Sequence, residues 1–329
     1  MTVVIRTSIQ LLLTWFFRVL QSTNMTPTKF RAVFGCFKSL SHFPATQVLG
    51  RLARLLLITS AIVDLAAGAR QVVAREPESV ETIASKFSDA REKHAPIERT
   101  DPNSVTVHNQ LLAKKKQGRI DVYFEGDSIT RRWGATDYPA YLEHWKKNFH
   151  GWNAANFAWG GDNTHNILWR LRNGEFDGVS PKVIVLQAGT NNLPWQGPAD
   201  DATVEDVVTG LAAIIGEFKS HAPDATIILT GVFARPQNPD AAPAIVKINR
   251  RLADLADGKE IRFININDQL VDDEGRPRPG VFSDEGLHLA VPGYEIWGNA
   301  IKPILTELLG PPAEHDHAPP PTGDPSASR

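Results

Sequence analysis

The stretch Ile120-Asp-Val-Tyr-Phe-Glu-Gly-Asp-Ser-Ile-Thr130 decides the fold of this chain. Its first half is an apolar run typical of a short buried strand, and Gly126 ends that run abruptly. A small residue two positions before Ser128 lets the chain turn sharply, so that the hydroxyl stands exposed where a helix begins. The alternative is a plain helix N-cap, because Asp127 and Ser128 are both usual there. Either interpretation predicts a strand, a turn and a helix.

The same alternation continues along the middle of the chain. Further strands are predicted at 183–186, 225–233 and 261–266, with a weaker candidate at 154–157. Apolar residues from Val204 to Phe218 recur at helical spacing, and Thr203 with Asp206 suggests a capping-box start. We therefore expect an α/β fold, a three-layer α/β/α sandwich around a five-stranded parallel sheet.

Ligands bind such sheets beyond the carboxyl ends of the strands, so the loops there are the candidate site. Gly160 and Gly161 let backbone N–H groups approach a ligand closely, or simply form a tight turn. Asn191 follows another strand, where its side-chain amide can donate to a developing oxyanion or cap a turn. Carboxylates stand three and four residues before His288, so one of them can hold Nδ1–H while Nε2 faces a nucleophile.

Four segments together resemble blocks I, II, III and V of the SGNH (GDSL) hydrolases: Gly126–Ile129, Gly160–Asp162, Gly189–Asn192 and Glu285–His288. The resemblance covers about 104–308 and is closest in character to the platelet-activating-factor acetylhydrolases of that family. It implies a flavodoxin-like three-layer fold and ester hydrolysis through an acyl-serine.

The resemblance also implies a role for each site residue. Ser128 would be the nucleophile and His288 the base, with the N–H groups of Ser128 and Gly161 and the Asn191 side chain as the oxyanion hole. The family usually has Asp three residues before the histidine, where this chain has Glu285; Asp284, one step further away, is the alternative acid. No metal and no cofactor are implied.

The expected substrate is a short-chain, most simply an acetyl, ester, with esters of carbohydrates as one class. Trp133 and Trp195 follow the serine and Asn191 loops and are expected to line the pocket, with Asp162 and Arg235 as further substrate-binding candidates. Arg235 is equally well a loop anchor. Two alternatives stay open: a lipid-directed acetylhydrolase or lysophospholipase-type esterase, and an inert binding module of the same fold.

Composition excludes several other classes of function. The 329 residues carry 35 Lys plus Arg and 37 Asp plus Glu, so the formal charge of -2 offers no basic field for nucleic acid. One cysteine, Cys36, rules out an internal disulfide and a zinc site built of cysteines. The partner expected is therefore a small-molecule or glycan ester, and the oligomeric state is left open.

The two ends of the chain differ from its middle. Residues 1–70 read as a targeting segment, because no acidic residue precedes Asp64 and a short apolar run leads to an Ala67-Gly-Ala69 cleavage site. The run is too short for a stable membrane span, so we expect a secreted or periplasmic protein, with an organellar transit peptide as the alternative. An over-extended gene start before Met25 or a later residue is a further interpretation. Residues 71–103 are predicted as a linker, 104–310 as the hydrolase domain and 311–329 as a disordered Pro-rich tail.

Overall fold

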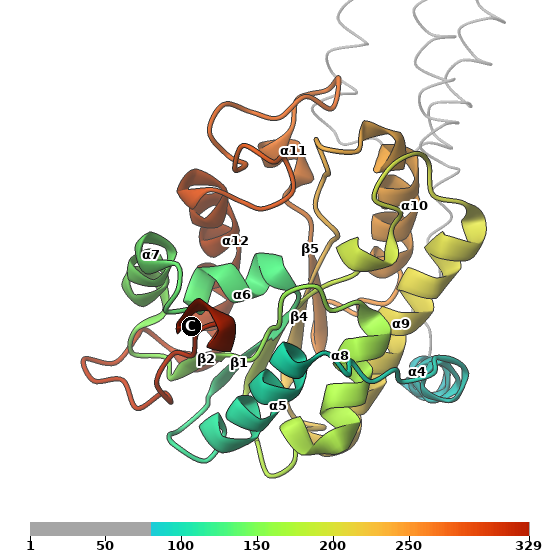
Figure 1. Ribbon diagram of the computed structural model, residues 1–329. Helices are drawn as coiled ribbons and strands as arrows, with labels where there is room; N and C mark the ends of the chain where they lie inside the picture. The colour runs from blue at the N-terminus through green and yellow to red at the C-terminus, as the bar shows by residue number, and fades with distance from the viewer. Residues whose placement is uncertain (1–79, 329) are drawn as a thin grey trace, which may run out of the picture. The chain divides into compact units, whose positions relative to one another are not determined.

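Five parallel strands form one sheet at the centre of the computed structural model, which describes residues 80–328 (Figure 1). The strands are β1 (Val122–Gly126), β2 (Ala154–Asn156), β3 (Val183–Gln187), β4 (Thr226–Thr230) and β5 (Ile261–Ile264). Their order, β2-β1-β3-β4-β5, is the flavodoxin-like one. The predicted α/β fold and all five predicted strands are confirmed. The predicted targeting segment, 1–70, lies outside the described residues.

Helices cover both faces of the sheet and make the three layers. One core holds α5 (Pro102–Lys114), α8 (Thr164–Arg170), α9 (Asp201–His221) and α10 (Ala242–Ala253) against the sheet. The other holds α6 (Ser128–Gly134), α7 (Pro139–Phe149), α11 (Asn267–Leu270) and α12 (Val291–Leu309). Single helical turns lie at Leu171–Glu175, Thr190–Asn192, Pro239–Ala241 and Pro325–Ser328. Successive strand residues point to opposite faces, so Tyr123 enters the first core and Phe124 the second.

The longest described helix, α9, shows how the local sequence fixes an element. Its apolar positions at helical spacing are buried, as predicted from Val204 to Phe218. The start differs from the prediction, because Asp200 rather than Thr203 is the N-cap and its carboxylate accepts the Thr203 backbone N–H at 2.8 Å. None of the described helices combines the length and the apolarity that a membrane crossing requires.

The predicted linker 71–103 is wrong over its described part, because residues 80–101 are folded onto the domain. Helix α4 (Val80–Lys93) packs on α9 and buries Phe87 and Ala90 at 6% exposure each. The chain after α4 is held by backbone bonds, since the N–H of Ile97 donates to the carbonyl of His165 at 3.1 Å. Asp89, Glu92 and Lys93 are exposed, and such charged residues dominate the composition of the segment, so its buried apolar residues were not recognised.

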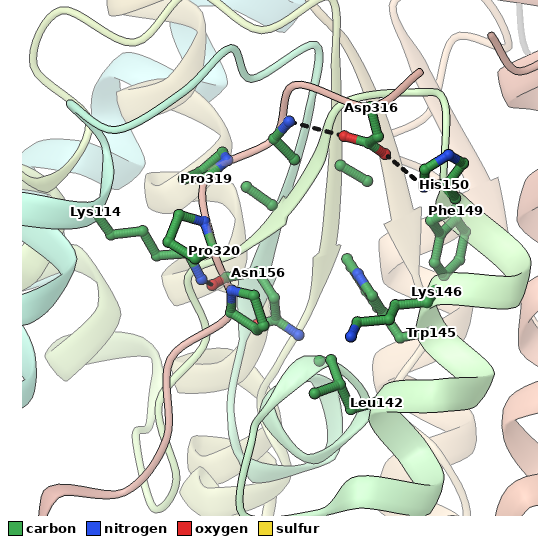
Figure 2. A pocket seen from close by; sticks show the side chains of 15 residues that line it. Lys114, Leu142, Trp145, Lys146, Phe149, His150, Asn156, Asp316, Pro319 and Pro320 are labelled. Carbon is green, nitrogen blue, oxygen red and sulfur yellow. Dashed lines mark hydrogen bonds and ion pairs between the residues drawn. The ribbon is translucent and has the colours of Figure 1, made fainter. Parts of the chain in front are cut away.

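The prediction of a disordered tail at 311–329 is also wrong, because residues 313–317 bond to the chain that leads into β2 and residues 322–324 bond to α5 and to the loop after α6. The N–H of Ala313 donates to the carbonyl of Gly151 at 2.9 Å, and the N–H of His317 donates to Asn153 Oδ1 at 2.7 Å. Figure 2 shows Asp316 directed toward His150 and the prolines that follow lying over Asn156. A cavity of about 330 Å³ lies between this tail, α7 and β2. Side-chain and backbone partners on the domain thus order a segment with no core of its own.

Candidate active site

Ser128 is the first residue of α6. It lies beyond the carboxyl end of β1, where the strand order of the sheet reverses. Asp127 is the N-cap, and its Oδ1 accepts the N–H of Ile129 at 2.9 Å, so Ser128 itself is not needed as a cap. A Cβ at position 126 would lie 2.1 Å from the carbonyl oxygen of Gln187 on β3. Only glycine therefore allows the sharp turn that presents the Ser128 hydroxyl.

Three side chains form a hydrogen-bonded chain at this point. Ser128 Oγ lies 2.8 Å from His288 Nε2, and His288 Nδ1 lies 2.5 Å from Glu285 Oε1. Glu285 reaches His288 because the loop folds tightly, with the N–H of Gly286 donating to the Ser283 carbonyl at 2.8 Å. Asp284 is exposed, and the structure gives it no contact with the imidazole.

The charges around His288 suit a base. Burial, followed by the nearby positive charge of Arg132, lowers the pKa of His288, and Glu285 opposes both effects. Burial acts to raise the pKa of Glu285, but interactions with Ser283, its own backbone N–H and His288 bring it down to about 2. Glu285 is therefore a carboxylate at neutral pH and accepts Nδ1–H, which leaves the lone pair of Nε2 for the Ser128 hydroxyl.

Arg132 is part of this site and was missed by the sequence reasoning. Its Nη1 donates to the same Oε1 of Glu285 that His288 contacts, at 2.9 Å. The signal available was its position four residues after Ser128 in a predicted helix, which places both side chains on one face.

The backbone around Ser128 offers donors for a negatively charged oxygen. Within the described residues, the N–H groups of Ser128 and Gly161 donate to no protein group. A Cβ at position 160 would lie 3.7 Å from the Cβ of Ser128, so the glycine pair adjoins the serine. The Asn191 side chain donates to the Asp162 carbonyl at 2.8 Å and keeps a second N–H. The structure therefore places the glycine turn beside Ser128 and the Asn191 side chain on that turn.

The sequence reasoning proposed Asp162 as a substrate-binding residue, but the structure buries it inside the domain. It is completely buried, with Oδ2 2.7 Å from Arg170 Nε and Oδ1 3.0 Å from Arg99 Nη1. Arg170 also binds Glu175 and, at 2.7 Å, Glu125. Burial raises the pKa of Glu125, while the positive charge of Arg170 acts in the opposite direction.

The two predicted tryptophans differ. Trp133 does not line a pocket, because it is fully buried between α7 and α12, and its Nε1 donates to His144 Nδ1 at 2.9 Å. Trp195, after the Asn191 loop, is 65% exposed. Arg235 is buried and donates to the carbonyls of Thr190 and Pro194 at 3.2 and 3.1 Å, which makes it the loop anchor of the alternative interpretation.

One cluster in the described residues has the composition of a metal site. His94 Nδ1 and His165 Nε2 lie 3.6 and 3.1 Å from Asp206 Oδ1. The two imidazoles are stacked, with centroids 3.7 Å apart and planes inclined by 16°. Their in-plane lone pairs therefore do not converge on one point, and the cluster is a hydrogen-bonded contact between the segment after α4 and helices α8 and α9.

Comparisons with known proteins agree with this geometry. The sequence profile of the GDSL-like lipase/acylhydrolase family matches residues 124–296. The α2 subunit of platelet-activating factor acetylhydrolase IB is 30% identical in Rattus norvegicus over 211 residues and in Homo sapiens over 219 residues, in each case covering 64% of this chain and 86% of the relative. A solved structure from Streptococcus pneumoniae described as a platelet activating factor is 20% identical with a TM-score of 0.50, covering 69% of this chain and 100% of that one. The chain belongs to the GDSL-like lipase/acylhydrolase family and is an ester hydrolase.

Proposed function

We propose that the protein hydrolyses carboxylic esters through an acyl-enzyme on Ser128. The observation that carries this proposal is the contact chain from Ser128 Oγ through His288 to Glu285, at 2.8 and 2.5 Å. His288 Nε2 takes the hydroxyl proton as Oγ bonds to the ester carbonyl carbon, and then gives it to the leaving alcohol as the C–O bond breaks. Water, deprotonated by the same nitrogen, attacks the acyl-serine; the proton then passes from Nε2 to Ser128 Oγ as the C–Oγ bond breaks and the acid is released. Glu285 stays ionised and stabilises the imidazolium.

The tetrahedral intermediate of each step carries its negative charge on the former carbonyl oxygen. The N–H groups of Ser128 and Gly161 and the free N–H of Asn191 are the donors we assign to that oxygen. Ser128 begins a helix, so the positive end of the helix dipole adds to its N–H. Donors fixed before the reaction stabilise the developing charge without reorganising.

The acyl group we propose is acetyl. Relatives 30% identical over 86% of their length bear the name platelet-activating factor acetylhydrolase, which supports a short acyl group. For the leaving alcohol, the exposed face of Trp195 suits a sugar or aryl ring. The name of the relatives favours a second candidate, an acetylated phospholipid.

The experiment is acetate release by the wild type and four variants. Ser128→Ala and His288→Asn should each lower kcat for p-nitrophenyl acetate by at least about a thousandfold, and Glu285→Gln by about ten- to a thousandfold. Asp284→Asn is the matched control, one residue away and exposed, and should keep wild-type turnover. Equal losses in Glu285→Gln and Asp284→Asn would contradict the assigned acid. A folded wild type that releases no acetate and resists an organophosphonate would identify an inert binding module.

Matched substrates distinguish the two candidate leaving alcohols, a sugar and a glycerophospholipid. Acetylated xylan and an acetylated glycerophospholipid are compared at equal acetyl concentration, and p-nitrophenyl esters from acetate to octanoate give the chain-length profile. Faster release from xylan with a fall beyond acetate supports the carbohydrate ester. A preference for the phospholipid or for longer acyl chains supports the lipid enzyme.

We also propose that the enzyme is exported. The signal-like sequence that ends at Ala67-Gly-Ala69 supports this. N-terminal sequencing of protein recovered from its producing cells tests it, with a mature start after Ala69 as the expected result and a retained upstream sequence as the contrary one.

A further inference from the structure

The peptide unit between Gly160 and Gly161 carries one of the proposed oxyanion donors. The local sequence does not fix which way this peptide unit faces. Residues 159–162 form a turn in which the N–H of Asp162 donates to the Trp159 carbonyl at 3.4 Å. Gly161 has a φ of +81°, the value of the third residue of a type II turn. Type I and type II turns have similar ends and differ in the orientation of the central peptide. With glycine on both sides, no side chain selects between them.

Arg99 makes the selection in this structure. Its Nη1 donates to the Gly160 carbonyl oxygen at 2.6 Å and to Asp162 Oδ1 at 3.0 Å. A Cβ at position 161 would lie 3.1 Å from the same Nη1, so the guanidinium lies directly against Gly161. Because the peptide unit is planar and trans, its carbonyl and its N–H point in opposite directions. A carbonyl held on Arg99 therefore directs the Gly161 N–H away from Arg99.

The guanidinium is itself held from two sides. Asp101 Oδ2 accepts its Nε at 3.2 Å, while Asp101 Oδ1 caps α5 by accepting the Ser104 N–H at 3.0 Å. On the other side, Asp162 is fixed by Arg170 in the buried network. Arg99 thus connects the start of α5 with the loop after β2. Several hydrogen bonds, on both sides of the guanidinium, fix its position.

We propose that Arg99 is a positioning residue that locks the Gly160–Gly161 peptide with the Gly161 N–H toward the oxyanion. This rests on the proposed esterase function. The charged hydrogen bond to the Gly160 oxygen also polarises the peptide and strengthens the opposite N–H as a donor. Without the guanidinium the turn exchanges between its two forms, and in one of them the carbonyl oxygen faces the oxyanion. Arg99 does not touch the substrate, so its loss is expected in kcat rather than KM.

The test compares Arg99→Met with Arg91→Met. The two arginine side chains are 29% and 34% exposed, and each pairs with a carboxylate, but Arg91 binds Glu217, away from the glycine turn. For p-nitrophenyl acetate, Arg99→Met should lower kcat by about 10- to 100-fold, less than removal of an oxyanion donor itself. KM should stay within about twofold of wild type. Millimolar guanidinium chloride should restore part of the lost kcat, because the vacated position is partly open to solvent.

The outcomes separate this proposal from the proposed function. Wild-type turnover that Ser128→Ala abolishes, together with Arg99→Met turnover equal to that of Arg91→Met, would overturn the role of Arg99 and leave the esterase standing. If Arg99→Met lowers both kcat and the melting temperature, and guanidinium does not restore kcat, the role of Arg99 is merely structural. Wild type without turnover would overturn both the role of Arg99 and the proposed esterase function.

Should Arg99→Met fail to fold, Arg99→Lys replaces it, with Arg91→Lys as control. An ammonium has no planar fork, so a smaller loss of kcat is expected, and equality with the control would be contrary evidence.

Discussion

At the scale of single residues, Arg132 contributes to the protonation state of His288. It lies 2.9 Å from Glu285, and its charge is second to burial among the causes that lower the pKa of His288. A base must be unprotonated to accept the Ser128 proton, so a lowered pKa keeps the enzyme active at lower pH.

Arg132→Gln tests this effect. Removing the positive charge raises the pKa of His288, so the acidic limb of the kcat/KM profile should move to higher pH. The plateau above that limb should fall by less than about tenfold, because Ser128, His288 and Glu285 all remain. The measurement is the pH dependence of p-nitrophenyl acetate hydrolysis. Arg251→Gln changes a partly exposed arginine on α10; it is the control and should leave the limb in place. An unmoved limb in Arg132→Gln would contradict the assigned cause.

At the scale of elements, α4 is a part of the domain whose contribution is measurable. Phe87→Ala removes a ring that is 6% exposed between α4 and α9 and should lower the free energy of unfolding by about 2–4 kcal/mol. Ile97→Ala is the matched control, since Ile97 belongs to the same segment and is 51% exposed. It should change stability by less than about 0.5 kcal/mol. Denaturant unfolding measures both, and two neutral substitutions would mean that the segment is the linker predicted from its composition.

The elements also show which parts of the structure a sequence discloses. The clearest strands were predictable because an apolar run, such as Val183–Leu186, is ended by a turn residue, whereas the short β2 was only a weaker candidate. Ser128, Gly161 and Asn191 were predictable because each comes soon after a predicted strand, and His288 because carboxylates stand three and four residues before it. The acid was narrowed to two adjacent carboxylates, and only the loop geometry distinguishes Glu285 from Asp284.

Other features depend on partners far along the chain. Trp133 follows the serine loop in sequence, but its position in α6 turns it inward onto α7 and α12. Arg99 carries no motif, and its contact with Gly160 crosses 61 positions of sequence. The ends of the domain were misjudged for the same reason. The proline-rich tail gains its order from hydrogen bonds to the domain. Helix α4 gains its order by burying Phe87 and Ala90 against α9, a partner more than a hundred residues further along the chain.

At the scale of the whole molecule, the C-terminal segment protects an edge of the sheet. Strand β2 has β1 on one side only, and residues 313–317 bond to the chain that leads into it. An uncovered strand edge is a template for pairing with another chain. Removing the residues after Pro311 should therefore lower the melting temperature by several degrees and produce concentration-dependent association.

Light scattering and thermal unfolding check this expectation, with two point variants as a finer comparison. Asp316→Ala removes the acceptor that binds the Gly151 N–H at 2.7 Å and should reproduce part of the loss in melting temperature. Glu314→Ala, two residues earlier and exposed, should not. A shortened protein that melts with the wild type and stays dispersed would show that the tail is ordered but dispensable.

The location of Arg99 has a practical consequence for anyone who trims this protein. The family profile begins at residue 124, and every group assigned to bond making and bond breaking lies inside it. A minimal enzyme cut at that boundary would keep its nucleophile, base and acid but lose the guanidinium that orients one donor. Such a fragment, even if it folded, would keep all the family's motif residues and still be a slow enzyme. Its low turnover would then be attributed, wrongly, to the catalytic residues. Boundaries for expression, directed evolution or domain swapping should therefore be placed before α4.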